Sequence, residues 1–72
     1  MEYRIRYDPA ADAVYIRLRD DEVAESVEID EGVIADLNHR GEVVGVEILN
    51  FSSSGVDLNE LIRRGVEAIA AR

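Results

Sequence analysis

VIADLNHRGEVVGVEIL, residues 33–49, is the stretch that decides the fold. Two runs in which apolar and polar residues alternate flank a short turn that contains a glycine. Alternation with period two is typical of strands with one buried face, so this stretch predicts an antiparallel hairpin. Pairing Asn38 with Val43 places Asp36 and Glu47 on one face and most of the apolar residues on the other. A shift by one residue would bury a carboxylate opposite valines, and this fixes the expected register.

The upstream segments continue the same pattern. Residues 3–7 and 14–19 predict a first hairpin, in which Ile5 lies opposite Ile16 and all the apolar residues share a face. Residues 23–30 predict one further strand between the two hairpins.

The C-terminal segment changes to a helical period. Asp57 followed by Glu60 forms a capping box with Asp in the Ser/Thr place, and the apolar residues after it predict a helix over 57–71. The Ser-Ser-Ser-Gly segment before it is expected to be irregular. The sequence therefore predicts an α+β fold, an antiparallel meander of about five strands over residues 3–50 with one C-terminal helix packed on one face. We expect residues 1–72 to form a single domain.

Composition narrows the classes of partner and site. The 72 residues contain no cysteine, which excludes disulfides and Cys-based metal sites. Sixteen acidic and eight basic residues, all of them arginine, give a formal net charge of −8, which argues against nucleic acid and favours a basic protein partner. No membrane-length apolar run or signal-peptide pattern is present, so we expect a cytoplasmic protein with no membrane partner. A core this small makes the folded state of a single chain only marginally stable. We therefore expect the protein to gain stability by forming a homodimer.

The sheet face away from the helix combines charged with apolar residues. Arginines gather on its first two strands and carboxylates on the next three. One interpretation is a solvated face with cross-strand ion pairs, which contribute about 0–1 kcal/mol each when exposed. The other is an isologous dimer interface, where the basic half of one copy meets the acidic half of another. The interface candidates are Arg4, Arg6, Tyr15, Arg17, Arg19, Ile34, Val43 and Leu49.

Four carboxylates are candidates for chemistry: Asp8, Asp12, Asp36 and Glu47. Asp8 before a proline is typical of a capped turn, in which the amides of Ala10 or Ala11 donate to its carboxylate, and no ligand is then required. Asp36 and Glu47 are expected nearly opposite each other, and a close pair could bind a cation or perform acid–base work. A small metal-binding protein or enzyme is therefore the alternative function. No catalytic set, cofactor motif or dedicated metal site is recognisable.

The run YDPAADAVYI at residues 7–16, together with Asp36, Gly41 and GVEIL at residues 45–49, resembles the YuzE-like family of small prokaryotic proteins of unknown function. The resemblance covers roughly residues 5–51 and implies no established activity. Similar proteins encoded beside toxin-like partners imply an antitoxin-like role, which acidic charge would suit. The expected function is a non-enzymatic protein–protein interaction domain, with antitoxin-like action as its most concrete form.

Overall fold

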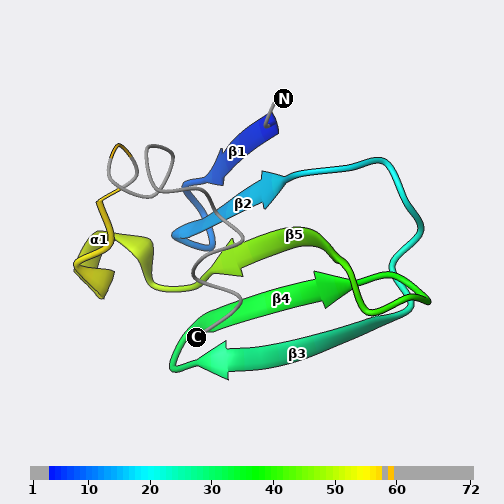
Figure 1. The fold of residues 1–72 in the computed structure, drawn as a ribbon. Coiled ribbons are helices and arrows are strands. Elements are labelled where there is room, and N and C mark those ends of the chain that lie inside the picture. The colour runs from blue at the N-terminus through cyan, green and yellow to red at the C-terminus, as the bar shows by residue number, and fades with distance from the viewer. Residues whose placement is uncertain (1–3, 58, 60–72) are drawn as a thin grey trace.

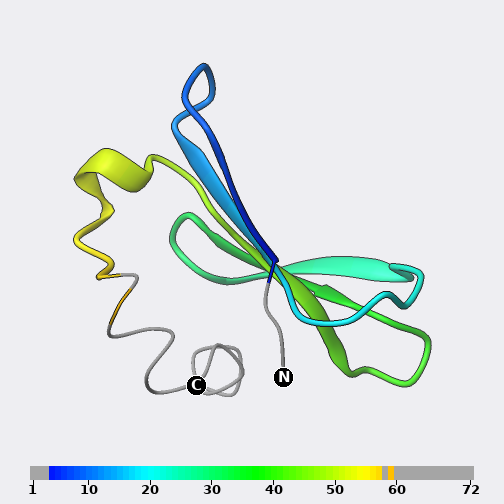
Figure 2. The ribbon, with the colours of Figure 1, turned by 90° about the horizontal axis from the view of Figure 1, so that it is seen from above.

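The computed structural model describes residues 4–57 and 59, and these residues form one antiparallel sheet followed by a short helix (Figure 1). The elements are β1 (Arg4–Asp8), β2 (Ala13–Arg17), β3 (Glu25–Asp30), β4 (Val33–Leu37), β5 (Val43–Ile48) and α1 (Phe51–Ser54). The predicted α+β class with five antiparallel strands is confirmed. Seen from above, the strands fan out across the sheet in the twist that L-residues impose (Figure 2).

The order of the strands differs from that of a simple meander. The sheet runs β1-β2-β5-β4-β3, so β5 lies between β2 and β4, and β1 and β3 are its edges. The chain after β2 therefore crosses to the far edge through residues 18–24 before β3 begins. Its first part stays attached to β5, because the amides of Leu18 and Arg19 both donate to the carbonyl oxygen of Val44, at 2.8 and 3.3 Å. This arrangement places β2 and β5, the two most buried strands, side by side.

The two predicted hairpin registers have different outcomes. In the first hairpin Ile5 pairs with Ile16, as expected. In the second, Asp36 pairs with Gly45 as expected, but a bulge follows and Leu37, rather than Asn38, is the partner of Val43. A bulge sets two consecutive residues against one and turns the strand locally.

The predicted position of Val43 is wrong, because the bulge turns this residue to the other face of the sheet. This residue was expected on the face that carries the charges, but it packs against the buried apolar cluster together with Val33. The cluster consists of Val14, Ile16, Leu18, Val46 and Ile48, each at most 7% exposed. We call the sheet face that carries this cluster the core face and the opposite one the outer face.

The chain after β5 forms α1, where an irregular segment was expected. Asn50 enters α1 and Gly55 leaves it with left-handed backbone angles, at φ 51° and 75°. Phe51 packs against the apolar cluster on the core face. The helix predicted over 57–71 lies, except for Asp57 and Asn59, outside the described residues. Asp57, at its expected start, accepts a hydrogen bond from the amide of Asn59 at 2.9 Å. Within the described part of the chain, no helix is long and apolar enough to cross a membrane.

Candidate functional site

The strand registers place most of the candidate residues in two rows across the outer face. One row joins Arg4, Arg17, Gly45, Asp36 and Ser26 from β1 to β3. The neighbouring row joins Arg6, Tyr15, Glu47, Ile34 and Glu28. Arginines therefore occupy the β1–β2 half of the outer face, and carboxylates occupy the half formed by β5, β4 and β3.

A hydrogen-bonded network crosses four strands in the centre of this face. The hydroxyl group of Tyr15 on β2 donates to Oδ2 of Asp36 on β4 at 2.9 Å, although β5 lies between these strands. The hydroxyl group of Ser26 on β3 donates to Oδ1 of the same carboxylate at 2.6 Å. Asp36 thus links β2 to the edge strand β3.

Gly45 makes this link possible because it has no side chain. A Cβ atom at this position would overlap the Tyr15 hydroxyl oxygen and lie 2.6 Å from Cζ of the same ring. It would also lie 3.0 Å from the carbonyl oxygen of Ile16, which belongs to the main chain. The tyrosine ring can lie across β5 only where β5 carries a glycine.

The surroundings of Tyr15 favour its neutral form. Partial burial and the hydrogen bond to Asp36 raise the pKa of the Tyr15 hydroxyl above its ordinary value of 10.0, while Arg17 partly opposes the rise. Near neutral pH this hydroxyl is therefore a donor rather than a base. The Tyr15–Asp36 pair is suited to holding strands together and to presenting the aromatic ring on the outer face.

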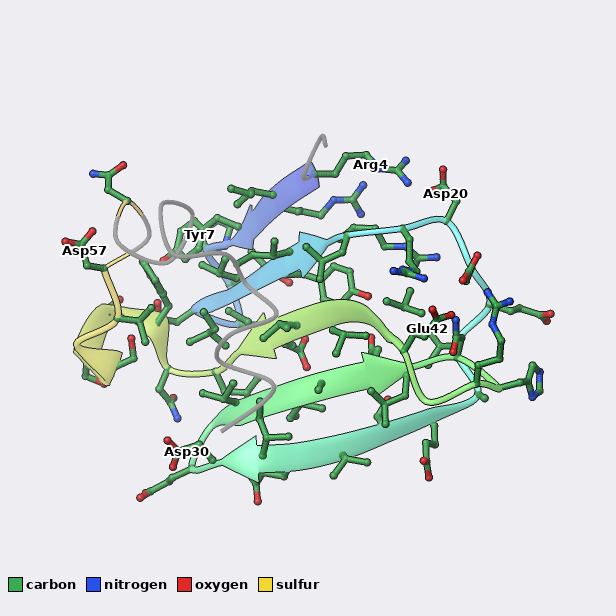
Figure 3. All side chains as sticks on the ribbon, in the orientation of Figure 1. Arg4, Tyr7, Asp20, Asp30, Glu42 and Asp57 are labelled. Atoms are coloured by element: carbon green, nitrogen blue, oxygen red, sulfur yellow. The ribbon has the colours of Figure 1, made fainter. Side chains whose placement is uncertain are left out.

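The basic half of the outer face contains a cleft of about 510 Å³. Its lining residues are Arg4, Ile5, Arg6, Tyr15, Arg17 and Asp20. Arg17 is held in place by the main chain, because its guanidinium donates to the carbonyl oxygens of Arg19 and Asp21, each at 2.8 Å. Arg4 and Asp20, which both line the cleft, form an ion pair with each other (Figure 3).

Two charged residues beside Tyr15 have no partner of opposite charge in the part of the chain that the structure describes. Arg6 pairs with Tyr15 across β1–β2, and Glu47 pairs with Tyr15 across β2–β5, so the two side chains flank the same ring. Neither forms a hydrogen bond or ion pair within residues 4–57 and 59. An unpaired cation and an unpaired anion thus stand on opposite sides of the tyrosine.

The other predicted interface residues lie at the margin of the face. Arg19 forms an ion pair with Glu42 at 3.2 Å, next to the buried amide of Asn38. That amide donates to the Glu42 carboxylate at 2.9 Å and is the largest cause of its lowered pKa. Leu49 follows β5 and is half-buried, with its amide donating to the carbonyl oxygen of Gly32 at 2.8 Å. These residues lie just beyond the ends of the strands.

Asp8 caps the turn between β1 and β2, as its sequence predicts. Its Oδ1 accepts hydrogen bonds from the amides of Ala10 at 3.0 Å and Ala11 at 3.3 Å. This arrangement satisfies the first amides of the turn in the way that an N-cap does.

Asp12 has a role that the sequence did not indicate. Its Oδ1 accepts a hydrogen bond from the Ser52 hydroxyl at 2.6 Å and from the Tyr7 hydroxyl at 3.1 Å. Its main-chain oxygen accepts the Phe51 amide at 2.8 Å. Asp12 therefore fastens α1 to the first hairpin, and Tyr7 adds an edge-on ring contact with Phe51 at 6.2 Å.

The carboxylate of Asp12 should make stability depend on pH. The Ser52 hydroxyl is the main reason why the pKa of Asp12 is lowered from 3.8. A lowered folded-state pKa gives a contribution that is complete above the ordinary value and is lost as the pH falls through the folded value. We expect Asp12→Asn to lower the melting temperature near neutral pH and to differ less from the wild type at about pH 2.

Ser52→Ala is the matched control for this prediction. It removes the hydroxyl that contributes most to the lowered pKa of Asp12 and should reduce the same pH dependence. Melting curves of all three proteins between neutral and acidic pH test this. A melting-temperature difference between Asp12→Asn and the wild type that stays constant over this range would contradict it.

The four candidate carboxylates fall into two separate groups. Asp8 and Asp12 lie in the turn that packs beside α1, whereas Asp36 and Glu47 lie on central strands of the outer face. Within residues 4–57 and 59, no three acidic or histidine side chains are grouped so that they could hold a metal ion. Asp36 has two hydroxyl donors as partners. The arrangement supports strand cross-linking and surface recognition.

Comparison with known proteins identifies the family but no activity. Residues 4–52 match the model of a family described as protein of unknown function (DUF2283). The match covers all five strands and the start of α1. No curated protein and no solved structure matches the chain. The chain therefore belongs to the DUF2283 family of proteins of unknown function.

Proposed function

We propose that this protein is a non-enzymatic interaction domain that forms a homodimer through its outer face. The observation that carries this proposal is the pair of unpartnered charges, Arg6 and Glu47, on either side of Tyr15. In an isologous interface each surface meets an identical one, so a surface that carries both charges can complement itself. Tyrosine and arginine are also enriched in the centres of interfaces.

The geometry of such a dimer follows from the strand register. A two-fold axis near Tyr15 would set Arg6 of each copy opposite Glu47 of the other, twice per dimer. The arginine-lined cleft would then receive carboxylates from the acidic half of the second copy. The accessible surface of one chain is 4950 Å², and a standard interface takes about 800 Å² from each partner, or about a sixth of it.

A dimer of this kind would keep a net acidic charge, which a different protein could meet. The formal net charge of each chain is −8. Such a surface attracts a basic protein and speeds its association. Neutralisation of a basic, toxin-like protein, an antitoxin-like role, is the most concrete form of this proposal.

Reversing the charges of Arg6 and Glu47 tests the dimer. Arg6→Glu would face Glu47 of the second copy with a carboxylate, and Glu47→Arg would face Arg6 with a guanidinium. Like charges across an interface cost up to several kcal/mol, so each single variant should be a monomer at concentrations where the wild type is a dimer. The double variant R6E/E47R should recover the dimer, because it restores opposite charges. Light scattering over a range of protein concentrations measures the mass.

Arg40→Glu is the control for these variants. Arg40 is exposed in the β4–β5 turn, beyond the ends of both strands, and its reversal should leave the dimer intact. A monomeric wild type at high concentration in moderate salt would refute the dimer. A double variant that is folded but still monomeric would refute the Arg6–Glu47 contact.

A further inference from the structure

The edge strand β3 offers a second surface, along the side of the sheet rather than across its outer face. β3 pairs with β4 alone within the described residues, so its other side lies at the open edge of the sheet (Figure 1). An edge strand presents main-chain amides and carbonyls to any extended segment that can pair with it. Almost all of Glu25–Asp30 is exposed.

The side chains of β3 determine which segment can approach. Glu25 pairs with Leu37 and Glu28 pairs with Ile34, which lie on the core face and the outer face respectively. Neither glutamate forms a hydrogen bond or ion pair within the part of the chain that the structure covers. Between them, Val27 is 39% exposed. The edge therefore combines unpaired carboxylates on both faces with an apolar side chain.

Edge charges commonly protect a sheet against unwanted pairing. Glutamates on β3 do so against another copy of β3, since two acidic strands repel each other. They do not repel a basic strand. β1 of a second copy is basic, but Arg4 and Arg6 are two residues apart and share the outer face, so β1 cannot reach Glu25 and Glu28 together.

We propose that β3 receives an extended basic segment of a different protein, which adds to the sheet as a further strand. The proposal rests on the proposed interaction function and names the docking strand and the sequence that it accepts. Glu25 and Glu28 are three residues apart, so the added strand needs two basic residues three apart, one on each face. In the more stable antiparallel orientation, a residue opposite Val27 directly follows the first of them, which gives the pattern Arg-Val-x-Arg.

Binding of a designed basic peptide to the protein tests this proposal directly. The probe is Thr-Thr-Arg-Val-Thr-Arg-Thr-Thr, labelled for fluorescence anisotropy and added to the full chain at low salt. Saturable binding that weakens with salt is expected, together with NMR shift changes centred on the β3 amides. A control peptide of the same composition, Thr-Arg-Val-Arg-Thr-Thr-Thr-Thr, places both arginines on one face and should bind at least about tenfold more weakly.

Charge-matched variants separate strand pairing from general attraction. E25K/E28K should weaken binding of the probe by at least about tenfold. E22K/E31K changes the net charge equally but alters residues outside β3, and it should bind nearly as the wild type does. E25Q/E28Q makes the same test with less perturbation if the reversed variant is unstable. The dimer variant Arg6→Glu should keep peptide binding, so failure of the dimer and failure of this edge are distinguishable. Absent binding, or equal loss in E25K/E28K and E22K/E31K, would overturn the proposal.

Discussion

Replacing Ile16 with alanine is expected to destabilise the protein more than any other substitution considered for the sheet. Ile16 is fully buried on β2 and pairs with Ile5 on one side and Val46 on the other. Removing a buried isoleucine side chain beyond Cβ costs about 2–5 kcal/mol, since apolar burial is lost and a cavity remains. Native domains are stable by only about 5–15 kcal/mol, and this chain is among the smaller ones. We expect a large unfolded fraction at physiological temperature, measurable by urea denaturation followed by circular dichroism.

Ile5→Ala is the matched control for this substitution. Ile5 is the cross-strand partner of Ile16, and the substitution to alanine removes the same atoms from it. Its side chain, however, is 43% exposed on the edge strand β1. Its loss should cost clearly less, because less apolar surface leaves a buried environment and water fills the gap. Equal losses of unfolding free energy for the two variants would show that β1 is as much a part of the core as β2.

The periodicity of apolar residues was sufficient to predict the class of fold and most of the pairing. Ile5 opposite Ile16 and Asp36 opposite Gly45 both follow from keeping carboxylates and guanidinium groups off the core face. The strand order did not follow, because alternation defines the faces of a strand but not its neighbours. The alternation of residues did not predict the bulge either. Val43 and Val44 are both apolar, so the sequence contains no signal that both turn toward the core.

The centre of the candidate site was only partly predictable. Its residues were assigned to one face, but the contact of Tyr15 with Asp36 requires β5 to lie between β2 and β4. Such a contact depends on the order of the strands in the sheet, which the alternation of residues within a strand does not reveal. The hydrogen bond from Ser52 to Asp12 was unpredictable for the same reason. The two residues are 40 positions apart, and the sequence around one gives no sign that it contacts the other.

Gly45→Ala is expected to be the second most damaging of the changes proposed here. The added methyl group would overlap the Tyr15 ring and press on the main-chain oxygen of Ile16. Tyr15 can move away only by giving up its hydrogen bond to Asp36, which would then keep Ser26 as its hydroxyl partner. Overpacking of this kind costs about 1–3 kcal/mol, more than the advantage that alanine has over glycine in a strand. Urea denaturation gives the change in unfolding free energy.

A double-mutant cycle decides whether contact with the Tyr15 ring causes the loss of stability expected for Gly45→Ala. In a Tyr15→Ala background the overlapping ring atoms are absent, so Gly45→Ala should be nearly neutral or slightly stabilising, apart from its contact with Ile16. In a Tyr15→Phe background the ring remains, and Cζ would still lie too close, so the cost should persist. An equal cost in all three backgrounds would place the strain in the main chain of β2 instead. The expected result would make the glycine of the GVEIL run a requirement of the tyrosine that crosses it, since Gly45 could be replaced at little cost only where Tyr15 is replaced as well.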